Sequence, residues 1–339
     1  MKRNRGMAEL LQALSRRQMM QGAAAVGFTV SSLPTFANAA EEKKLSFYNW
    51  DTYIGETTLD DFKATGIEVT MDLFADNDEL FAKLREGNPG YDLIVPSNDY
   101  VARMAAAGML EELDHSKIPN LSHLYPRFLG ENVAFDPGRK YSVPYMWGTI
   151  GIGYRKSKVT TPPDSWAVLY DSDEYAGKIS IMSDCGTMIQ MALRYLGHSI
   201  NSQDDADLLA SGEVDIVMEW NGDIAQLMSE DDDIGYVVPK EGGLVWEDTL
   251  AIPKGAPHPD NAHAFINYVY EPEVNTLIAE YIEYATPNKT AAESMDDSYS
   301  KNPAIFPPED VLAKSESSLY LGEDHNAKLD EMCTRIFAA

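Results

Sequence analysis

Aromatic side chains stand next to carboxylates at three places in this sequence, a combination that could bind an organic cation. The clusters are residues 49–53 (Asn-Trp-Asp-Thr-Tyr), 219–223 (Glu-Trp-Asn-Gly-Asp) and 246–248 (Trp-Glu-Asp). Trp and Tyr faces attract a cation by about 0.5–2 kcal/mol each, and a carboxylate–ammonium hydrogen bond contributes about 1.5–3 kcal/mol. One such cluster is more simply a core tryptophan beside a solvated acid. Three together predict a site for a slender amine with a charge at each end.

These clusters, and a few further polar residues, are expected where predicted strands pass into loops. Ligands of open α/β sheets bind outside the carboxyl ends of the strands, so side chains at such positions converge. Ser97, Asp99, Asp184 and Tyr284 occupy similar strand-to-loop positions. The candidate ligand-binding residues are therefore Trp50, Asp51, Tyr53, Ser97, Asp99, Asp184, Trp220, Asp223, Trp246, Asp248 and Tyr284.

An alternation of strands and helices must position these residues. Period-two and continuous apolar runs predict strands over 45–50, 67–73, 91–97, 179–182, 214–218 and 235–239. Helical spacing predicts helices over 57–64, 79–85, 101–110, 188–196, 261–270 and 273–282. This order is typical of an α/β fold with mostly parallel sheets. The Gly-rich run 148–153 continues an apolar stretch and indicates close backbone packing.

Sequence signatures of catalysis are missing. The six histidines form no H-E-x-x-H pair and no other metal-ligand spacing, and no nucleophile elbow, P-loop or dinucleotide-binding glycine motif occurs. We therefore expect a binding protein with no cofactor and no metal. Cys185 and Cys333 are too few for a disulfide framework or a four-thiolate zinc site. They could pair with each other or stay free, and free thiols are the favoured interpretation.

The charge and the first 39 residues indicate an exported acidic protein. The formal net charge of −27 excludes a nucleic-acid partner and disfavours an anionic membrane surface. Residues 1–39 contain a basic start, the Arg16-Arg17 pair, an apolar stretch over 22–33 and Ala37-Asn38-Ala39, the parts of a twin-arginine-type signal peptide. Cleavage near Ala39 leaves 22 Lys and Arg against 53 Asp and Glu. We predict a periplasmic protein, monomeric and not inserted in the membrane.

From about Leu45 onward, the sequence resembles the periplasmic substrate-binding proteins of spermidine/putrescine ABC importers. The resemblance rests on Asn49-Trp50 and on the runs 91–97, 141–148, 220–223, 239–243, 248–253 and 284–288. It implies a two-lobed type II binding-protein fold with mixed or parallel sheets. Lobe 1 would be residues 40–149 and 247–292, and lobe 2 residues 150–246 and 293–339. Asp223 and the region 307–311 resemble the putrescine-preferring branch.

The resemblance also implies roles for the candidate residues. Trp50 and Tyr53 would contribute to the ligand box, Ser97 would bond an amine, and Asp184 would hold one amino group. Trp220 and Trp246 would pack on the methylene chain. Asp223 and Asp248 would bind the amines, and Tyr284 would close the pocket.

Three departures from the family pattern bear on the ligand. Thr187 stands where relatives usually have a second acid, and Asp51-Thr52 reverses the usual order of hydroxyl and acid. The second lobe is trimmed near 200–211. The expected function is capture of a putrescine-like or spermidine-like amine for an ABC permease. The alternatives are a receptor for another cationic or zwitterionic ligand, or a ligand-dependent signalling adaptor.

Overall fold

The first predicted elements form a parallel, helix-flanked part of the sheet. The computed structural model describes residues 41–130, 133–182, 184–201 and 216–338. Strand β1 pairs in parallel with β2 on one side and β3 on the other. The elements of this part are β1 (Lys44–Trp50), α2 (Thr58–Phe62), β2 (Glu68–Phe74), α3 (Asn77–Arg85), β3 (Leu93–Ile94) and α4 (Asn98–Ala106). The predicted strand 91–97 is buried through Pro96 but has only two strand residues.

Two strands that the sequence analysis did not predict run through the middle of the sheet. They are β4 (Ser142–Arg155) and β8 (Val245–Ala251), which pair antiparallel with each other. The expectation of mostly parallel sheets is therefore wrong in this region, and the sheet is mixed. The strand order is β2-β1-β3-β8-β4-β6-β5, with β7 also paired to β4.

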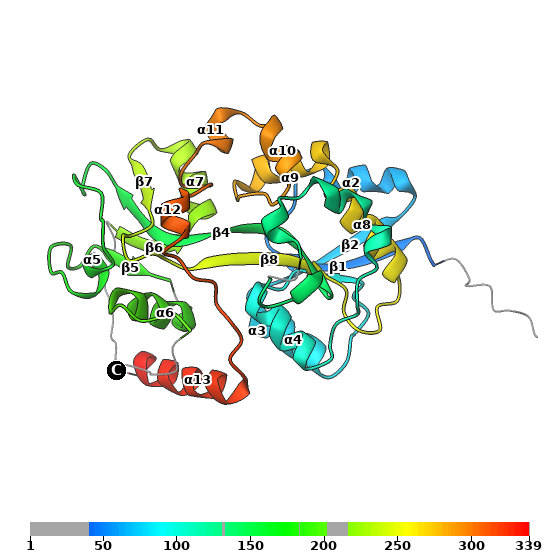
Figure 1. Cartoon of the computed structure of the whole chain (residues 1–339), viewed down its shortest axis with the longest axis horizontal. Helices are drawn as coiled ribbons and strands as arrows, with labels where there is room; N and C mark the ends of the chain where they lie inside the picture. The colour runs from blue at the N-terminus through cyan, green and yellow to red at the C-terminus, as the bar shows by residue number, and fades with distance from the viewer. Residues whose placement is uncertain (1–40, 131–132, 183, 202–215, 339) are drawn as a thin grey trace, which may run out of the picture. The chain divides into compact units, whose positions relative to one another are not determined.

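The second part of the sheet is built around the far end of β4. Strand β6 pairs antiparallel with β4 and parallel with β5. Its elements are α5 (Ala167–Tyr170), β5 (Ile179–Ile181), α6 (Cys185–Tyr195), β6 (Ile216–Trp220), α7 (Asn221–Glu230) and β7 (Ile234–Val237). Figure 1 shows β1 and β2 with α2–α4 and α8 at one end of β4 and β8, and β5–β7 with α5–α7 at the other.

Helices from the last third of the chain complete the core. Helix α8 (Pro259–Val269) buries Phe265 against Phe47 and Phe62, and α9 (Pro272–Ile282) follows directly. The remaining helices are α10 (Lys289–Ser294), α11 (Asp297–Ser300), α12 (Glu309–Leu312) and α13 (Glu323–Phe337). Short 3₁₀ turns occur at Lys63–Thr65, His115–Lys117, Pro119–His123, Pro126–Phe128 and Pro137–Arg139.

The favoured interpretation of the two cysteines as free thiols is wrong. Cys185 begins α6 and Cys333 lies in α13, and they form a disulfide with a Cα–Cα distance of 5.7 Å. The bond spans a sequence separation of 148 residues. Ile189 and Leu193 of α6 pack beside it against Leu329 and Met332 of α13. The two cysteines meet only because α6 and α13 pack together in the folded chain. Local sequence pattern therefore does not predict this disulfide.

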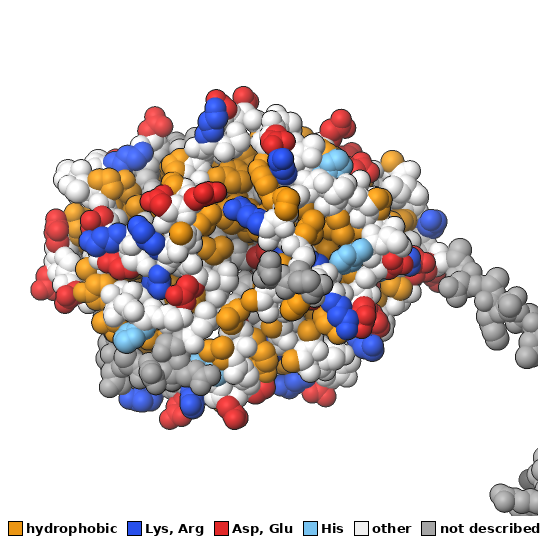
Figure 2. All heavy atoms as spheres, in the orientation of Figure 1, with side chains coloured by type: hydrophobic (Ala, Val, Ile, Leu, Met, Phe, Trp, Pro, Cys, Tyr) orange, Lys and Arg blue, Asp and Glu red, His pale blue; other side chains and the backbone are white. Residues whose placement is uncertain are grey.

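Some predictions fall outside the described residues. These include the signal peptide over 1–39 and most of the trimmed segment, since residues 202–215 are not described. The predicted lobe boundaries at 149/150 and 246/247 lie inside β4 and β8, and the lobe division stays a prediction. Within the described ranges, no helix is long and apolar enough to cross a membrane. On the face in Figure 2, Lys and Arg are scattered among Asp and Glu and do not form one basic patch.

Candidate ligand-binding site

Strand β8 presents Trp246 and Asp248 on one face and Glu247 on the other, because side chains alternate along a strand. Glu247 forms an ion pair with the buried Arg139, with Oε1 2.6 Å from Nη1. Its charge is therefore already compensated within the fold. Trp246 and Asp248 remain from this cluster to meet a ligand, and both are buried.

Two hydroxyl groups hold the carboxylate of Asp248. Tyr53, three residues after β1, donates to Oδ2 at 2.9 Å, and Ser97, the N-cap residue of α4, donates to Oδ1 at 2.6 Å. Asn77 fixes Ser97 in turn, since its Nδ2 lies 2.9 Å from the Ser97 hydroxyl. Burial raises the pKa of Asp248 to about 7, although both hydroxyls favour the charged form. The site thus contains a carboxyl that titrates near neutral pH.

A second acid, Asp99, lies close to Asp248. It sits in the first turn of α4 and accepts a hydrogen bond from the Ser318 hydroxyl. Burial raises its pKa to about 6, and the nearby negative charge of Asp184 adds to this effect. Asp99 likewise helps to raise the pKa of Asp248. Among the ion pairs of the described residues, none includes Asp99, Asp184, Asp223 or Asp248, so these acids lack a cationic partner there.

Aromatic rings connect the Asp248 end of the site to a second acidic end. The ring of Trp246 contacts Tyr284 edge to face at 5.0 Å and Trp220 at 5.7 Å. Tyr284 also contacts Tyr53 at 5.7 Å. Gly222 makes this packing possible, because a Cβ there would lie 2.3 Å from the Tyr284 ring. Tyr53, Tyr284 and Trp246 are buried and Trp220 is half-buried, and the four rings form a continuous apolar wall of the kind that suits a methylene chain or a cation.

Asp223 and Glu219 form the acidic end near α7. The hydroxyl of Tyr284 donates to Asp223 Oδ1 at 3.0 Å. Asp223 keeps more than a third of its surface exposed, yet nearby protein still raises its pKa through loss of solvation. The pKa of Glu219 is raised by burial and, less strongly, by the charge of Asp223. This end offers two carboxylates that are more open to solvent than Asp248.

The remaining candidates Trp50, Asp51 and Asp184 form their hydrogen bonds outside this group. The indole N–H of Trp50 donates to the backbone oxygen of Val95 at 2.9 Å, and the indole ring packs on Phe74 at 4.5 Å. These contacts hold the indole against the core. Asp51 is exposed and accepts a hydrogen bond from the backbone N–H of Thr52. Asp184 is the exposed N-cap of α6 and accepts from the backbone N–H of Thr187 at 2.8 Å.

Two placements predicted from sequence need correction. Tyr284 follows helix α9 and not a strand, and it reaches the site across Gly222. Trp246 and Asp248 lie within β8 and not at its end. The second correction follows from the antiparallel pairing of β8 with β3 and β4, which brings the middle of β8 to the edge where the parallel strands end.

Four residues with a part in the site were not among the candidates. Glu219, inside the cluster 219–223, is the second carboxylate beside Asp223. Asn77 positions Ser97, Gly222 makes room for Tyr284, and Ser318 bonds Asp99 from the C-terminal segment. Gly222 lies inside the aromatic cluster 219–223 and could have been found there, since only glycine permits such close approach. Asn77 and Ser318 carry no local signal, because their partners are distant in sequence.

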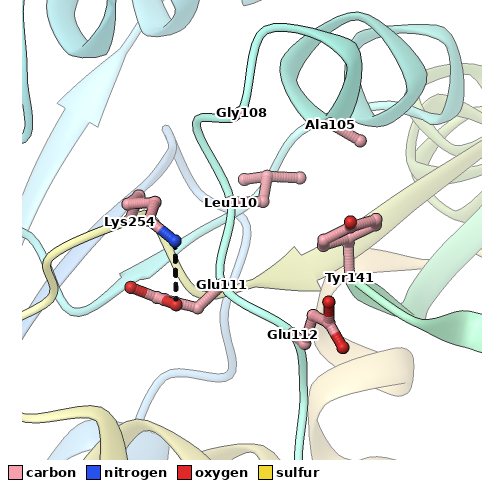
Figure 3. A pocket seen from close by; sticks show the side chains of 7 residues that line it. All are labelled: Ala105, Gly108, Leu110, Glu111, Glu112, Tyr141 and Lys254. Carbon is pink, nitrogen blue, oxygen red and sulfur yellow. Dashed lines mark ion pairs between the residues drawn. The ribbon is translucent and has the colours of Figure 1, made fainter.

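A separate hollow near the end of α4 differs from this site in its charge balance. It has a volume of about 340 Å³ and is shown in Figure 3. Glu111 in this hollow pairs with Lys254 at 3.6 Å, and Glu112 pairs with Lys140 at 2.8 Å. Because its acids are already paired with lysines, this hollow is a poor receptor for an amine.

Comparison with known proteins identifies the family. A sequence profile described as bacterial extracellular solute-binding protein matches residues 58–201 and 186–307. The chain belongs to this family. It is 32% identical to the putrescine-binding periplasmic protein SpuD of Pseudomonas aeruginosa, covering 90% of this chain and 93% of that protein. It is 34% identical to the spermidine/putrescine-binding periplasmic protein of Escherichia coli, covering 89% and 92%.

The fold agrees with that of solved members of this solute-binding family. The substrate-binding protein PotD of a spermidine/putrescine ABC transporter from Streptococcus pneumoniae superposes with a TM-score of 0.76. The two are 29% identical over 88% of this chain and 99% of the other. The predicted resemblance and the binding-protein fold class are therefore confirmed. The relatives are transport proteins that bind substrates, so the expectation of a binding protein over an enzyme is also confirmed.

Proposed function

We propose that this protein is a periplasmic receptor that captures a putrescine-like or spermidine-like amine and delivers it to an ABC importer. The observation that carries the proposal is Asp248, a buried acid held by two hydroxyls with no cationic partner among the described residues. A buried carboxylate is costly unless an opposite charge meets it, and a ligand ammonium would supply that charge. Relatives named for putrescine and spermidine support the same ligand class.

The arrangement assigns a task to each part of the site. One ammonium would bind Asp248, while Ser97 and Tyr53 hold its two oxygens in place. The methylene chain would lie along the rings of Trp246, Trp220 and Tyr284. The other ammonium would bind Asp223 and Glu219. Burying four methylenes contributes about 3 kcal/mol at roughly 0.8 kcal/mol each, so the spacing of the carboxylates decides which amine is preferred.

Asp99 and Asp184 extend the acidic surface beyond Asp248. The charge of Asp184 helps to raise the pKa of Asp99, and the charge of Asp99 helps to raise the pKa of Asp248. In the proposal Asp99 and Asp184 meet a further amino group of a longer amine, and Asp99 partly replaces the acid missing at Thr187. Trp50 and Asp51 stay secondary candidates. Trp50 bonds to Val95 in the core, and Asp51 accepts a hydrogen bond from its neighbour Thr52.

Export and delivery complete the proposal. The chain would leave the cytoplasm through the twin-arginine-type signal over residues 1–39, with cleavage near Ala39, and act as a monomer. Its two lobes, with the boundaries given above, would close on the ligand by a hinge. The closed form would then dock on the permease in the inner membrane.

Thermal unfolding of the chain from Ala40 tests the ligand class. We would measure the midpoint with putrescine, cadaverine, spermidine, spermine and agmatine, and with GABA as a zwitterionic control. Ligand at about 100 times its dissociation constant stabilises the folded state by about 2.7 kcal/mol, a shift of a few degrees. The proposal predicts a shift with at least one amine, absent with GABA and in the Asp248→Asn variant. No shift with any amine contradicts it.

A further inference from the structure

Residues 315–336, which we call the C-terminal strap, are attached to the second part of the sheet. Glu316 forms a parallel bridge with Leu244 just before β8, and its carboxylate pairs with Arg194 of α6 at 2.9 Å. Gln190 of α6 donates to the Ser318 hydroxyl at 2.9 Å. At the far end of the strap, Cys333 is bonded to Cys185 of α6. The strap thus contacts α6 at both of its ends.

The same strap is attached to α4 in the first part of the sheet. Asn98 donates to the backbone oxygen of Ser318 at 2.6 Å. Arg103 binds Glu323 through two hydrogen bonds, from Nε at 2.8 Å and from Nη2 at 2.9 Å. Arg103 is itself fixed, because its guanidinium stacks on Phe81 at 4.1 Å and lies 3.3 Å from Asp78. Figure 1 shows α13 lying below α6, with the chain before it passing from α12 toward α4.

Both helices that the strap joins begin at candidate ligand residues. Helix α4 starts with Ser97 as N-cap and carries Asp99 in its first turn. Helix α6 starts with Asp184 as N-cap, directly followed by the disulfide residue Cys185. Between them, Ser318 contacts Asn98 and Asp99 on one side and Gln190 on the other. The strap therefore bridges α4 and α6 through Ser318, close to the start of α4.

We propose that the C-terminal strap, closed by the Cys185–Cys333 disulfide, positions the starts of α4 and α6 so that Ser97, Asp99 and Asp184 meet one ligand together. Cys333, Glu323 and Ser318 are positioning residues in this scheme. The ligand part of the inference rests on the proposed amine function. Pre-organised groups bind more tightly because less ordering accompanies binding. Release of the strap at either helix then weakens binding even though the acids themselves are intact.

A double-mutant cycle on amine affinity tests the tether. Cys333→Ser frees the far end of the strap from α6 without changing the sequence beside Asp184, and Glu323→Gln removes the charge pair of the strap with Arg103. We expect affinity for the amine with the largest thermal shift to fall about 10-fold for Cys333→Ser and about 3-fold for Glu323→Gln. The double variant should match Cys333→Ser alone, because a strap free at one end transmits nothing from the other.

Matched controls separate a tether from general destabilisation. Asp297→Asn breaks the exposed Lys301 pair elsewhere on the surface and should leave affinity unchanged. If Cys333→Ser does not fold, folded wild-type protein treated with excess dithiothreitol replaces it; the reagent forms its own cyclic disulfide and each cysteine gains a hydrogen. Unchanged affinity after release, or fully additive losses, overturns the proposal.

Hydrogen exchange gives a readout that needs no ligand. In empty protein, Cys333→Ser should speed exchange in the first turn of α4, although the substitution lies in α13. Asp297→Asn should not. If no amine binds the wild type but this coupling is present, the amine function fails and the tether stands. If amines bind and exchange at α4 is unaffected, the tether fails and the amine function stands.

Discussion

The two acidic ends of the candidate site are built differently. Asp248 is buried and accepts hydrogen bonds from Ser97 and Tyr53, which are themselves held by Asn77 and Tyr145. Asp223 is exposed, and one Tyr284 hydroxyl reaches it. Because electrostatic interactions strengthen as water is excluded, an ammonium gains more at Asp248 than at Asp223. The Asp248 end should provide most of the affinity, and the Asp223 end should tolerate variation in chain length.

The largest expected effect comes from removing the charge at the buried end. Asp248→Asn preserves the shape but leaves an ammonium without its buried counter-charge, a loss of several kcal/mol at comparable buried pairs. We expect affinity for the preferred amine to fall by about 100-fold or more by isothermal titration calorimetry. The matched surface variant Asp297→Asn should bind like the wild type. A loss below 10-fold would mean that the buried end is not the main anchor.

The next largest effect is that of pH. Acids with raised pKa values stabilise the empty protein at low pH, and this contribution is lost as pH rises through about 6 for Asp99 and about 7 for Asp248. The amine binds their charged forms, so its affinity should change in the opposite direction. Between pH 7.5 and 6.0 we expect affinity to fall about 15-fold, since the ionised fraction falls about 8-fold for Asp248 and about 2-fold for Asp99, measured by calorimetry. Affinity independent of pH would show that neither acid meets the amine.

A smaller effect is expected from the hydroxyl that orients Asp248. Ser97→Ala removes a hydrogen bond to a charged group, worth about 1.5–3 kcal/mol, and leaves Asn77 without its acceptor. Affinity should fall about 10-fold, and the midpoint of the pH dependence should move upward because the charged form is less favoured. A change in affinity with no shift in the pH profile would indicate a packing effect only.

The smallest effect is expected at the exposed end. Asp223→Asn should weaken binding only about 3-fold, because solvent screens this carboxylate and Glu219 remains beside it. The ratio of the affinities for putrescine and cadaverine should change more in Asp223→Asn than in Asp248→Asn. If Asp223→Asn lowers amine affinity as much as Asp248→Asn does, the difference in burial between the two ends does not determine affinity.

Local sequence pattern was sufficient for the parallel strands and for half of the described helices, namely α2, α3, α4, α6, α8 and α9, but it missed α7 and α13. The alternation over 45–106 is realised in β1, β2 and α2–α4 within a few residues. The antiparallel strands β4 and β8 could not be found in this way. In β4, three glycines, a proline and burial on both faces remove any period-two signal, and in β8 the neighbouring polar residues Asp248 and Thr249 are both buried. Gly148 nevertheless fits the predicted close packing, because a Cβ there would lie 2.7 Å from Trp246.

The sequence indicated which residues belong to the candidate site better than it indicated how they are arranged and buried. Tyr53, Ser97, Trp246, Asp248, Asp223 and Tyr284 do come together through hydrogen bonds and ring contacts. The difference in burial between Asp248 and Asp223 was not predictable, because it depends on neighbours more than a hundred residues away. The Cys185–Cys333 bond was missed for the same reason.

Proton release on binding tests the central claim most directly, that a buried, partly protonated acid receives the amine. Putrescine would be titrated at pH 6.5 by calorimetry in two buffers of different ionisation enthalpy. Asp248 and Asp99, with pKa values of about 7 and 6, together hold roughly one proton at this pH in the empty protein. The account predicts release of roughly one proton per amine bound. Binding without proton release, or no binding, would contradict it.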